Sequence, residues 1–334
     1  MSEMIRVVRL HETGGPEVLK IETVPLPDPG ASEVRLRVKA IGLNRAEVMW
    51  REGKYLIAPQ LPAKIGFEAS GVVDAVGPDV DKSLIGKRVS NLPAFSPNDY
   101  GVYGDAAIVP LAAVVEIPGD LSFEAGTAIW VPYLTAYGSL VRIGRLKKGD
   151  FVLITAASSS TGLAATQLVK SEGAFVIAAT RTAAKKAELL AAGADHVIVT
   201  NDEDLPSRVM SITGGLGARL VYDPIGGSGL PALAEATALN GIIFEYGLLS
   251  TEPTPYPLLT ALLRRLTIRA YDAAPELFKT PEVLEEGKEY LFRKIKDGSF
   301  KPHLHKDVFS LDQIVEAHRF MEKNQQFGKI IVRP

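Results

Sequence analysis

The chain has 334 residues, of which 46% are hydrophobic and 23% are charged, with a formal net charge of −2. This composition predicts two globular domains; the dispersed Lys and Arg exclude a basic footprint for nucleic acid, and no apolar run reaches the roughly 18–20 residues that cross a bilayer. The absence of cysteine excludes disulfides, thiolate nucleophiles and Cys-ligated zinc.

The first part of the chain has the pattern of a β-rich domain. The N-terminal residues MSEMIRVVRL alternate as a strand does, and Gly and Pro separate further alternating or β-branched runs at Val34–Ala40, Ala69–Val76 and Ala106–Val109. The N-terminus lacks the apolar core of a signal peptide, so we expect a cytoplasmic protein.

From about Ser122 the pattern changes to short apolar strands separated by helical stretches of roughly 10–15 residues. The predicted strands are Phe151–Thr155, Phe175–Thr180, Val197–Val199, Leu220–Tyr222, Ile242–Glu245 and Thr267–Ala270. Parallel strands that are buried on both faces form continuous apolar runs. The sequence therefore predicts an α/β domain with a doubly wound, six-stranded parallel sheet.

The C-terminal segment follows a different pattern. It predicts a helix over Pro281–Ile295, a strand around His303–Val308, a helix over Leu311–Met321 and a final strand, Lys329–Val332. This order lacks the rhythm of the six strands, so we expect the segment to return to the first domain. The predicted domains are therefore 1–124 with 272–334, and 125–271.

Residues 149–186, GDFVLITAASSSTGLAATQLVKSEGAFVIAATRTAAKK, have the order strand, tight loop, helix, strand. Such a unit places a helix N-terminus against the pyrophosphate of a dinucleotide. The Gly-x-Gly-x-x-Gly fingerprint is missing, because only Gly162 remains and the turn holds Ser158, Ser159 and Ser160. A Ser-rich turn in another kind of α/β domain therefore stays an alternative.

The end of the second strand of this unit favours NADPH over NADH. An acidic side chain there accepts hydrogen bonds from the ribose of NAD, whereas cations accommodate a 2′-phosphate. Here Thr180, Arg181 and Thr182 are followed by Lys185 and Lys186, and no acidic residue occurs before Glu188. A solvated basic face is the alternative interpretation.

A family resemblance rests on several blocks in order. Residues 66–77, GFEASGVVDAVG, are similar to the Gly-His-Glu-x-x-Gly-x-Val-x-x-x-Gly block of medium-chain alcohol dehydrogenases, but Phe67 replaces the zinc-binding His and the first Cys ligand falls near Asn44. With GLNRAEVMWREGKY, AIWVPYLTAYGSL, AAGADHVI, VYDPIGG, IIFEYG and FGKIIV, the whole chain resembles the zinc-independent quinone oxidoreductase (zeta-crystallin-like) branch of the medium-chain dehydrogenase/reductase superfamily. The resemblance implies a Rossmann domain with a β-rich GroES-like catalytic domain, NADPH as cofactor and no metal.

The resemblance also implies roles for individual residues. Asn44 and Thr135 would face the nicotinamide, Ser159 to Gly162 would lie under the pyrophosphate, and Arg181 with Lys185 would take the 2′-phosphate. The full predicted cofactor set is Asn44, Thr135, Ser158, Ser159, Ser160, Thr161, Gly162, Thr180, Arg181, Thr182, Lys185, Tyr246, Gly247, Leu248 and Lys329. The family usually has Ala-Gly-Gly-Val-Gly where this chain has Ser-Ser-Ser-Thr-Gly, so we expect altered loop geometry rather than lost binding.

The expected chemistry is hydride transfer to an acceptor that spreads the incoming charge. A quinone or an α,β-unsaturated carbonyl needs no metal, because hydrogen-bond donors at its oxygen stabilise the transition state. Tyr55 and Asn44 are the predicted catalytic residues, with hydride delivered across the cleft between the two domains. For Tyr55, a tyrosine that only packs is the alternative.

The sequence also bears on a metal site, on an alternative function and on partners. His303 and His305 share a face of a predicted strand, but no third ligand is nearby, so we predict no metal site. A non-catalytic NADPH-binding redox sensor or structural relative is the alternative function. The expected partner is a small-molecule substrate rather than nucleic acid or membrane, and the resemblance suggests a homodimer through the edge strand Thr267–Ala270.

Overall fold

The computed structural model describes residues 3–334 and contains two compact units. The first unit comprises the chain up to Val131 together with Pro302–Pro334, and the second comprises Pro132–Lys301. Within the described residues, no helix is long and apolar enough to cross a membrane. Each unit has its own core, because its strands bury one or both faces against helices or a second sheet.

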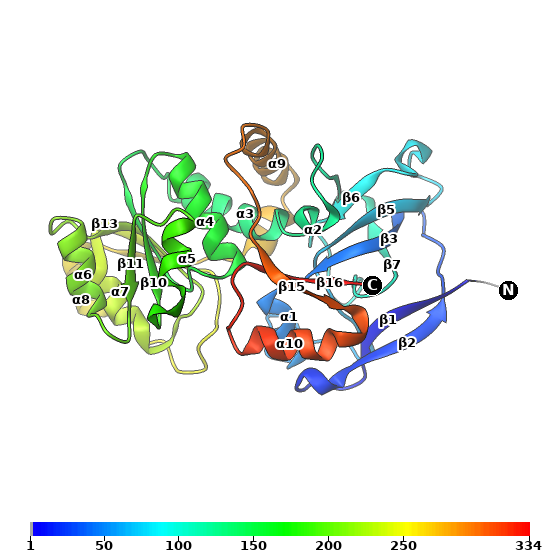
Figure 1. The fold of residues 1–334 in the computed structure, drawn as a ribbon, viewed down its shortest axis with the longest axis horizontal. Coiled ribbons are helices and arrows are strands. Elements are labelled where there is room, and N and C mark those ends of the chain that lie inside the picture. The colour runs from blue at the N-terminus through cyan, green and yellow to red at the C-terminus, as the bar shows by residue number, and fades with distance from the viewer. Residues whose placement is uncertain (1–2) are drawn as a thin grey trace. The chain divides into compact units, whose positions relative to one another are not determined.

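The second unit is built on one six-stranded parallel sheet, as the sequence predicts. Its strand order is β11-β10-β9-β12-β13-β14, and Figure 1 shows the helices α4 to α8 packed around it. The strands are β9 (Phe151–Ile154), β10 (Phe175–Thr180), β11 (His196–Val199), β12 (Ala218–Asp223), β13 (Thr237–Glu245) and β14 (Thr267–Ala270). The order reverses between β9 and β12, which is the switch point where Rossmann folds bind ligands.

Five helices of this unit connect the parallel strands: α4 (Ser160–Ser171), α5 (Lys186–Ala191), α6 (Leu205–Ile212), α7 (Leu230–Ala236) and α8 (Leu258–Arg264). The helix α9 (Pro281–Lys296) follows the last of these strands, and α3 (Trp130–Ala136) precedes the first of them. A π-helical turn, Tyr137–Ile143, continues α3. Short alanine- and leucine-rich helices of this kind cover both faces of a parallel sheet.

The first unit is β-rich, also as predicted. One sheet has the order β15-β16-β3-β5-β6-β8 with β7 paired to β3, and a smaller sheet has the order β2-β1-β4. The strands are β1 (Met4–Leu10), β2 (Leu19–Pro25), β3 (Glu33–Gly42), β4 (Ala63–Lys64), β5 (Ala69–Val76), β6 (Arg88–Asn91), β7 (Ala106–Pro110), β8 (Val114–Glu116), β15 (Leu304–Ser310) and β16 (Lys329–Arg333). The helices are α1 (Arg45–Arg51), α2 (Phe123–Gly126) and α10 (Ile314–Glu322).

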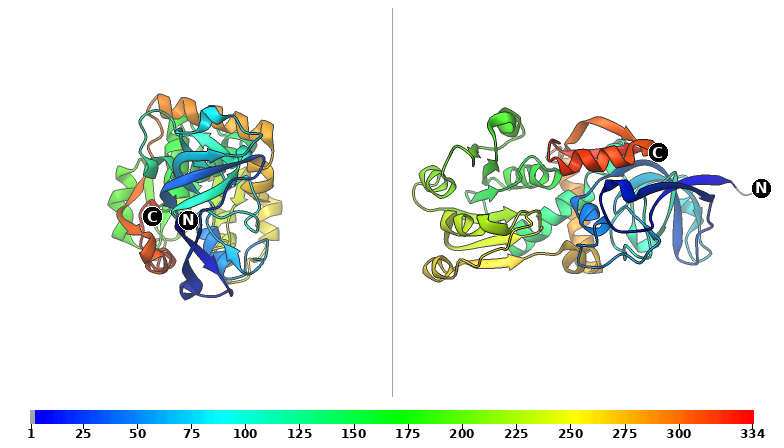
Figure 2. Two further views of the ribbon diagram at one scale, coloured as in Figure 1. Left: turned by 90° about the vertical axis from the view of Figure 1, so that its right-hand side faces the viewer. Right: turned by 90° about the horizontal axis from the view of Figure 1, so that it is seen from below.

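The C-terminal segment returns to the first unit. β16 lies between β15 and β3, where Ile331 pairs with Gly42, and Figure 2 shows these last strands beside the strands from the start of the chain. The return begins at Pro302, later than the border predicted from the sequence. The helix α9 stays with the second unit because Tyr290 stacks near Tyr137, with ring centroids 4.8 Å apart, and donates a hydrogen bond to Glu172.

Candidate functional site

The loop after β9 is a compact helix cap. Ser159 is the N-cap residue of α4, and its Oγ accepts a hydrogen bond from Gly162 N–H at 3.0 Å. A Cβ at Gly162 would lie 2.7 Å from the carbonyl oxygen of Ala157, so the close turn requires glycine here. Ser160 and Thr161 form the first half-buried turn of the helix. The positive end of the helix dipole at this turn favours a bound anion.

The basic residues after β10 lie next to this loop. Lys185 Nζ is 3.2 Å from Ser158 Oγ, and burial lowers the pKa of the Lys185 ammonium, while the charge of Glu188 opposes this effect and that of Arg181 adds to it. Arg181 and Thr182 are exposed, and Thr180 closes the strand with its hydroxyl directed to the Thr182 carbonyl. A half-buried ammonium beside a cationic neighbour gains most from an anionic ligand such as a phosphate.

Two carboxylates meet next to the switch point of the sheet, at the ends of β12 and β13. Thr155, directly after β9, donates a hydrogen bond to Asp223 at the end of β12, and Asp223 also accepts Gly226 N–H at 2.7 Å. The strand register places Asp223 beside Glu245 at the end of β13. Burial, and then the charge of Asp223, raise the pKa of Glu245 to about 8, so Glu245 holds a proton at neutral pH.

Tyr246, Gly247 and Leu248 directly follow Glu245 at the end of β13. The ring of Tyr246 stacks on that of Tyr222 with centroids 3.9 Å apart, and burial holds the pKa of both hydroxyls well above the usual range. Gly247 approaches Pro224 so closely that a Cβ would lie 2.7 Å from its carbonyl oxygen, and Leu248 is exposed. Elsewhere in this unit Thr135 is buried in α3, where its carbonyl oxygen accepts the Ser139 hydroxyl at 2.9 Å.

In the first unit, Asn44 lies against a buried ion pair. Lys329 Nζ donates to Glu68 Oε2 at 2.5 Å and to Asn44 Oδ1 at 2.7 Å, and both charged side chains are fully buried. Glu68 Oε1 accepts Val131 N–H at 3.1 Å. Burial raises the pKa of Glu68, while the Lys329 ammonium opposes the rise. A Cβ at Gly42 would lie 2.6 Å from Lys329 Cε. The lysine side chain can therefore reach Asn44 only because residue 42 is a glycine.

A second buried carboxylate, Glu47, holds Asn44 from the other side. It accepts Asn44 N–H at 2.7 Å, Phe67 N–H at 2.6 Å and the Tyr103 hydroxyl at 2.5 Å. Tyr55 is half-buried in the loop after α1, with its ring centroid 6.0 Å from that of Phe67. The Glu47 carboxylate thus joins two of the positions singled out in this part of the sequence, Asn44 and Phe67, and the ring of Tyr55 lies beside that of Phe67.

Comparison with known proteins assigns the chain to a family. Residues 160–282 match the zinc-binding dehydrogenase family, and residues 30–119 match the alcohol dehydrogenase GroES-like domain. The chain is 30% identical to 2-haloacrylate reductase from a Burkholderia species over 99% of each protein, and 30% identical to quinone oxidoreductase 1 of Escherichia coli strain K12 over 98% of this chain and 99% of that protein. The chain belongs to the quinone oxidoreductase branch of the medium-chain dehydrogenase/reductase superfamily.

A solved structure of this branch has the same fold. The Escherichia coli quinone oxidoreductase complexed with NADPH is similar to the chain with a TM-score of 0.90 and 30% identity, covering 98% of this chain and 100% of that one. The family and the fold class predicted from the sequence are therefore confirmed.

The residues present do not fit the zinc ion for which part of the superfamily is named. Phe67 has no ligand atom, Asn44 Oδ1 accepts a hydrogen bond from the Lys329 ammonium, and the chain has no cysteine. Among residues 3–334, no group of three or more His, Cys, Asp or Glu side chains is arranged to hold a metal ion. The cation that contacts Asn44 is the Lys329 ammonium rather than a metal ion.

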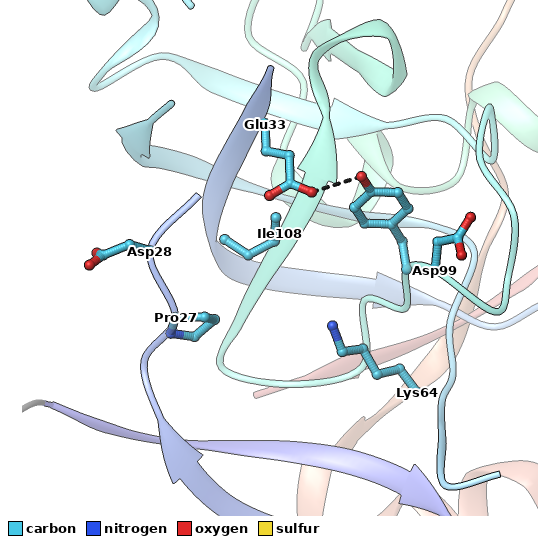
Figure 3. A pocket seen from close by; sticks show the side chains of 7 residues that line it. Pro27, Asp28, Glu33, Lys64, Asp99 and Ile108 are labelled. Carbon is cyan, nitrogen blue, oxygen red and sulfur yellow. Dashed lines mark hydrogen bonds between the residues drawn. The ribbon is translucent and has the colours of Figure 1, made fainter. Parts of the chain in front are cut away.

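A cavity of about 430 Å³ in the first unit contains none of the predicted site residues (Figure 3). It is lined by Pro27, Asp28, Glu33, Lys64, Asp99, Tyr100 and Ile108, and the Tyr100 hydroxyl donates to Glu33 at 2.7 Å. Its lining includes three carboxylates and a single ammonium, a charge balance that disfavours the phosphates of a dinucleotide.

Several functional candidates were missed in the sequence, and only some had a detectable signal. Asp223 and Glu245 end two predicted parallel strands, whose carboxyl ends share one edge of a sheet, so their proximity could have been inferred. Glu68 stands beside Phe67 in the quoted family block. Glu47 follows Asn44 at the spacing of a helix capping box, so its contact with the Asn44 N–H could have been inferred. Tyr103 had no such signal, because its pairing with Glu47 joins residues 56 positions apart in the chain.

Proposed function

We propose that the protein is an NADPH-dependent oxidoreductase that transfers hydride, without a metal, to a quinone or an α,β-unsaturated carbonyl. The observation that carries this proposal is the position of Lys185, a half-buried ammonium beside the capped N-terminus of α4. The relatives support the same class, since one is named a quinone oxidoreductase, one a 2-haloacrylate reductase, and the similar solved structure is complexed with NADPH.

The second unit has the residues for the cofactor. Ser159, Ser160, Thr161 and Gly162 present a helix N-terminus to the pyrophosphate, and Arg181 with Lys185 pair with the 2′-phosphate, so NADPH is preferred over NADH. Ser158 orients the Lys185 ammonium. Tyr246, Gly247 and Leu248, with Thr135, serve the nicotinamide side. Bound NADPH supplies the hydride.

The first unit has polar groups for the acceptor. Asn44 is fixed by Lys329 and Glu47, and Tyr55 lies next to the apolar ring of Phe67. Neutral donors stabilise a transition state in which charge spreads into a conjugated carbonyl, whereas a simple alkoxide needs a metal. We therefore expect Asn44 and Tyr55 to serve the acceptor oxygen, and saturated alcohols to be poor substrates.

The experiment is a panel of quinones, enals, enones and enoyl thioesters with NADPH, run with and without an excess of chelator. We expect steady NADPH oxidation with at least one class and no loss in chelator. Tight NADPH binding with no turnover on the whole panel would instead indicate a redox sensor. Activity that is lost in chelator and restored by zinc would contradict the metal-free mechanism.

A homodimer is the proposed assembly of the protein, and α8 supports it. Leu258, Leu259, Leu262 and Leu263 are between 58% and 71% exposed, and their spacing places them on one side of the helix. The edge strand β14 has unpaired backbone groups on its outer side. A second copy would cover both, so light scattering should give the mass of a dimer, and Leu259→Glu with Leu263→Glu should give a monomer. The cytoplasmic location stays a prediction.

A further inference from the structure

A buried series of hydrogen bonds in the first unit joins α10 to α1. Arg51 is fully buried, and its Nη1 lies 3.0 Å from His318 Nδ1. Because a guanidinium only donates, His318 Nδ1 accepts, and the proton of the neutral imidazole sits on Nε2. Burial and the charge of Arg51 lower the pKa of His318 to about 3, so the imidazole is neutral at physiological pH.

The remaining hydrogen bonds of this series all lead to the Glu47 carboxylate. His318 Nε2–H faces the Tyr103 oxygen at 3.3 Å, and the Tyr103 hydroxyl therefore donates to Glu47 at 2.5 Å. Glu47 also accepts the backbone N–H groups of Asn44 and Phe67. With three donors aimed at it, the carboxylate is the form of Glu47 that this arrangement fits.

We infer that Glu47 is a positioning residue, which ties together the segments carrying Asn44 and Phe67 at the place where zinc enzymes of the superfamily put a metal ion. The inference rests on the proposed function, because Asn44 is assigned there to the acceptor. A metal joins these two positions through side-chain ligands. Glu47 joins them through backbone N–H groups, so one side chain is free to be apolar and the other to hydrogen-bond.

Protonation of Glu47 disrupts the arrangement, because a carboxylic acid needs an acceptor, and the Tyr103 oxygen could accept its proton only by turning its own hydroxyl hydrogen away from Glu47. Burial raises the pKa of Glu47 to about 7, while Tyr103, the two N–H groups and the Lys329 ammonium limit the rise. Of the other charged groups around these hydrogen bonds, Arg51 is paired with Glu322 at 2.8 Å and Lys329 with Glu68, and Arg45 donates to the Met321 carbonyl. Activity is therefore expected to fall as the pH drops below about 7.

The first experiment compares the pH profiles of kcat/KM for the wild type and two tyrosine variants. In Tyr103→Phe a donor to ionised Glu47 is lost, so the acid limb should move to higher pH by about one pH unit. Tyr100→Phe is the matched control. It removes the same kind of tyrosine–carboxylate hydrogen bond, from Tyr100 to Glu33, which is not part of this hydrogen-bond series. The control should leave the limb where it is in the wild type.

The second experiment needs no turnover. The backbone amide resonances of Asn44 and Phe67 should titrate together with a midpoint near pH 7 in the wild type, shift in Tyr103→Phe and stay flat in Glu47→Gln. Wild-type turnover with an acid limb that Tyr103→Phe does not move, or amides that ignore pH, would overturn the inference and leave the proposed function intact. If no acceptor is reduced, the proposed function fails, and the amide titration still decides the role of Glu47.

Discussion

Two lysines, one in each unit, show two uses of a buried positive charge. Lys329 is fully buried, and its ammonium donates to Glu68 at 2.5 Å and to Asn44 at 2.7 Å. Lys185 is half-buried, contacts the Ser158 hydroxyl at 3.2 Å, and has a pKa lowered by burial. The first charge is neutralised within the protein and orients its neighbours. The second contacts the Ser158 hydroxyl, is influenced by the charges of Glu188 and Arg181, and lies at the place proposed above for the 2′-phosphate.

The comparison predicts its largest effect for Lys329→Met. The substitution keeps the length of the side chain but leaves the Glu68 carboxylate buried and unpaired, so the free energy of unfolding at neutral pH should fall by about 3–5 kcal/mol in urea titrations. The double variant Lys329→Met with Glu68→Gln should recover most of this loss. A double variant as unstable as the single one would mean that packing of the lysine stem, rather than its charge, is what matters.

Tyr55 poses the same question for a neutral group, which either packs internally or serves a ligand. If its hydroxyl donates to the acceptor oxygen, Tyr55→Phe should lower kcat by about 10²–10³ with little change in stability. Steady-state kinetics with the best acceptor of the panel measures the effect. A change of only a few-fold would assign Tyr55 to packing against Phe67.

Lys185→Met is the matched partner of Lys329→Met and should have the opposite pattern. Loss of one charged partner of the 2′-phosphate should weaken NADPH binding by about 1.5–3 kcal/mol, or roughly 10- to 150-fold, and NADH binding much less. The free energy of unfolding should change much less than in Lys329→Met, because Lys185 is only half-buried and its removal leaves no fully buried carboxylate unpaired. Fluorescence titration with both cofactors tests this, and equal losses would show that Lys185 is structural.

Glu245 can be compared with Glu68, because a bound proton rather than a lysine neutralises the Glu245 carboxylate. Its pKa is raised from 4.5 to about 8, so its contribution to stability is complete below about pH 4.5 and is lost as the pH rises through 8. Water screens part of the effect at this half-buried side chain, and we expect the wild type to lose about 1–2 kcal/mol relative to Glu245→Gln over this range. Urea titrations at several pH values measure the difference, and parallel curves would contradict it.

The sequence predicts the second unit better than the first, for a physical reason. Continuous apolar runs identify all six strands of the parallel sheet, and the positions of Ser159 and Lys185 follow from their offsets after two of these strands. The contacts of Lys329 join residues 285 and 261 positions apart, and no local pattern encodes such pairings. For the same reason, the sequence predicts the end of the second unit before α9. The contact that keeps α9 in this unit, between Tyr290 and Tyr137, joins residues far apart in the chain.

The insertion of the second unit between β8 and β15 sets the order in which the protein can be completed during synthesis. β3, which leads to Asn44, leaves the ribosome early, whereas β16, which carries Lys329, follows only after the whole Rossmann sheet. A nascent chain can therefore assemble its nucleotide-binding sheet while Glu68 still lacks its lysine. The ammonium that hydrogen-bonds Asn44 is therefore among the last parts of the chain to be synthesised, and the proposed acceptor site is completed after the proposed nucleotide site.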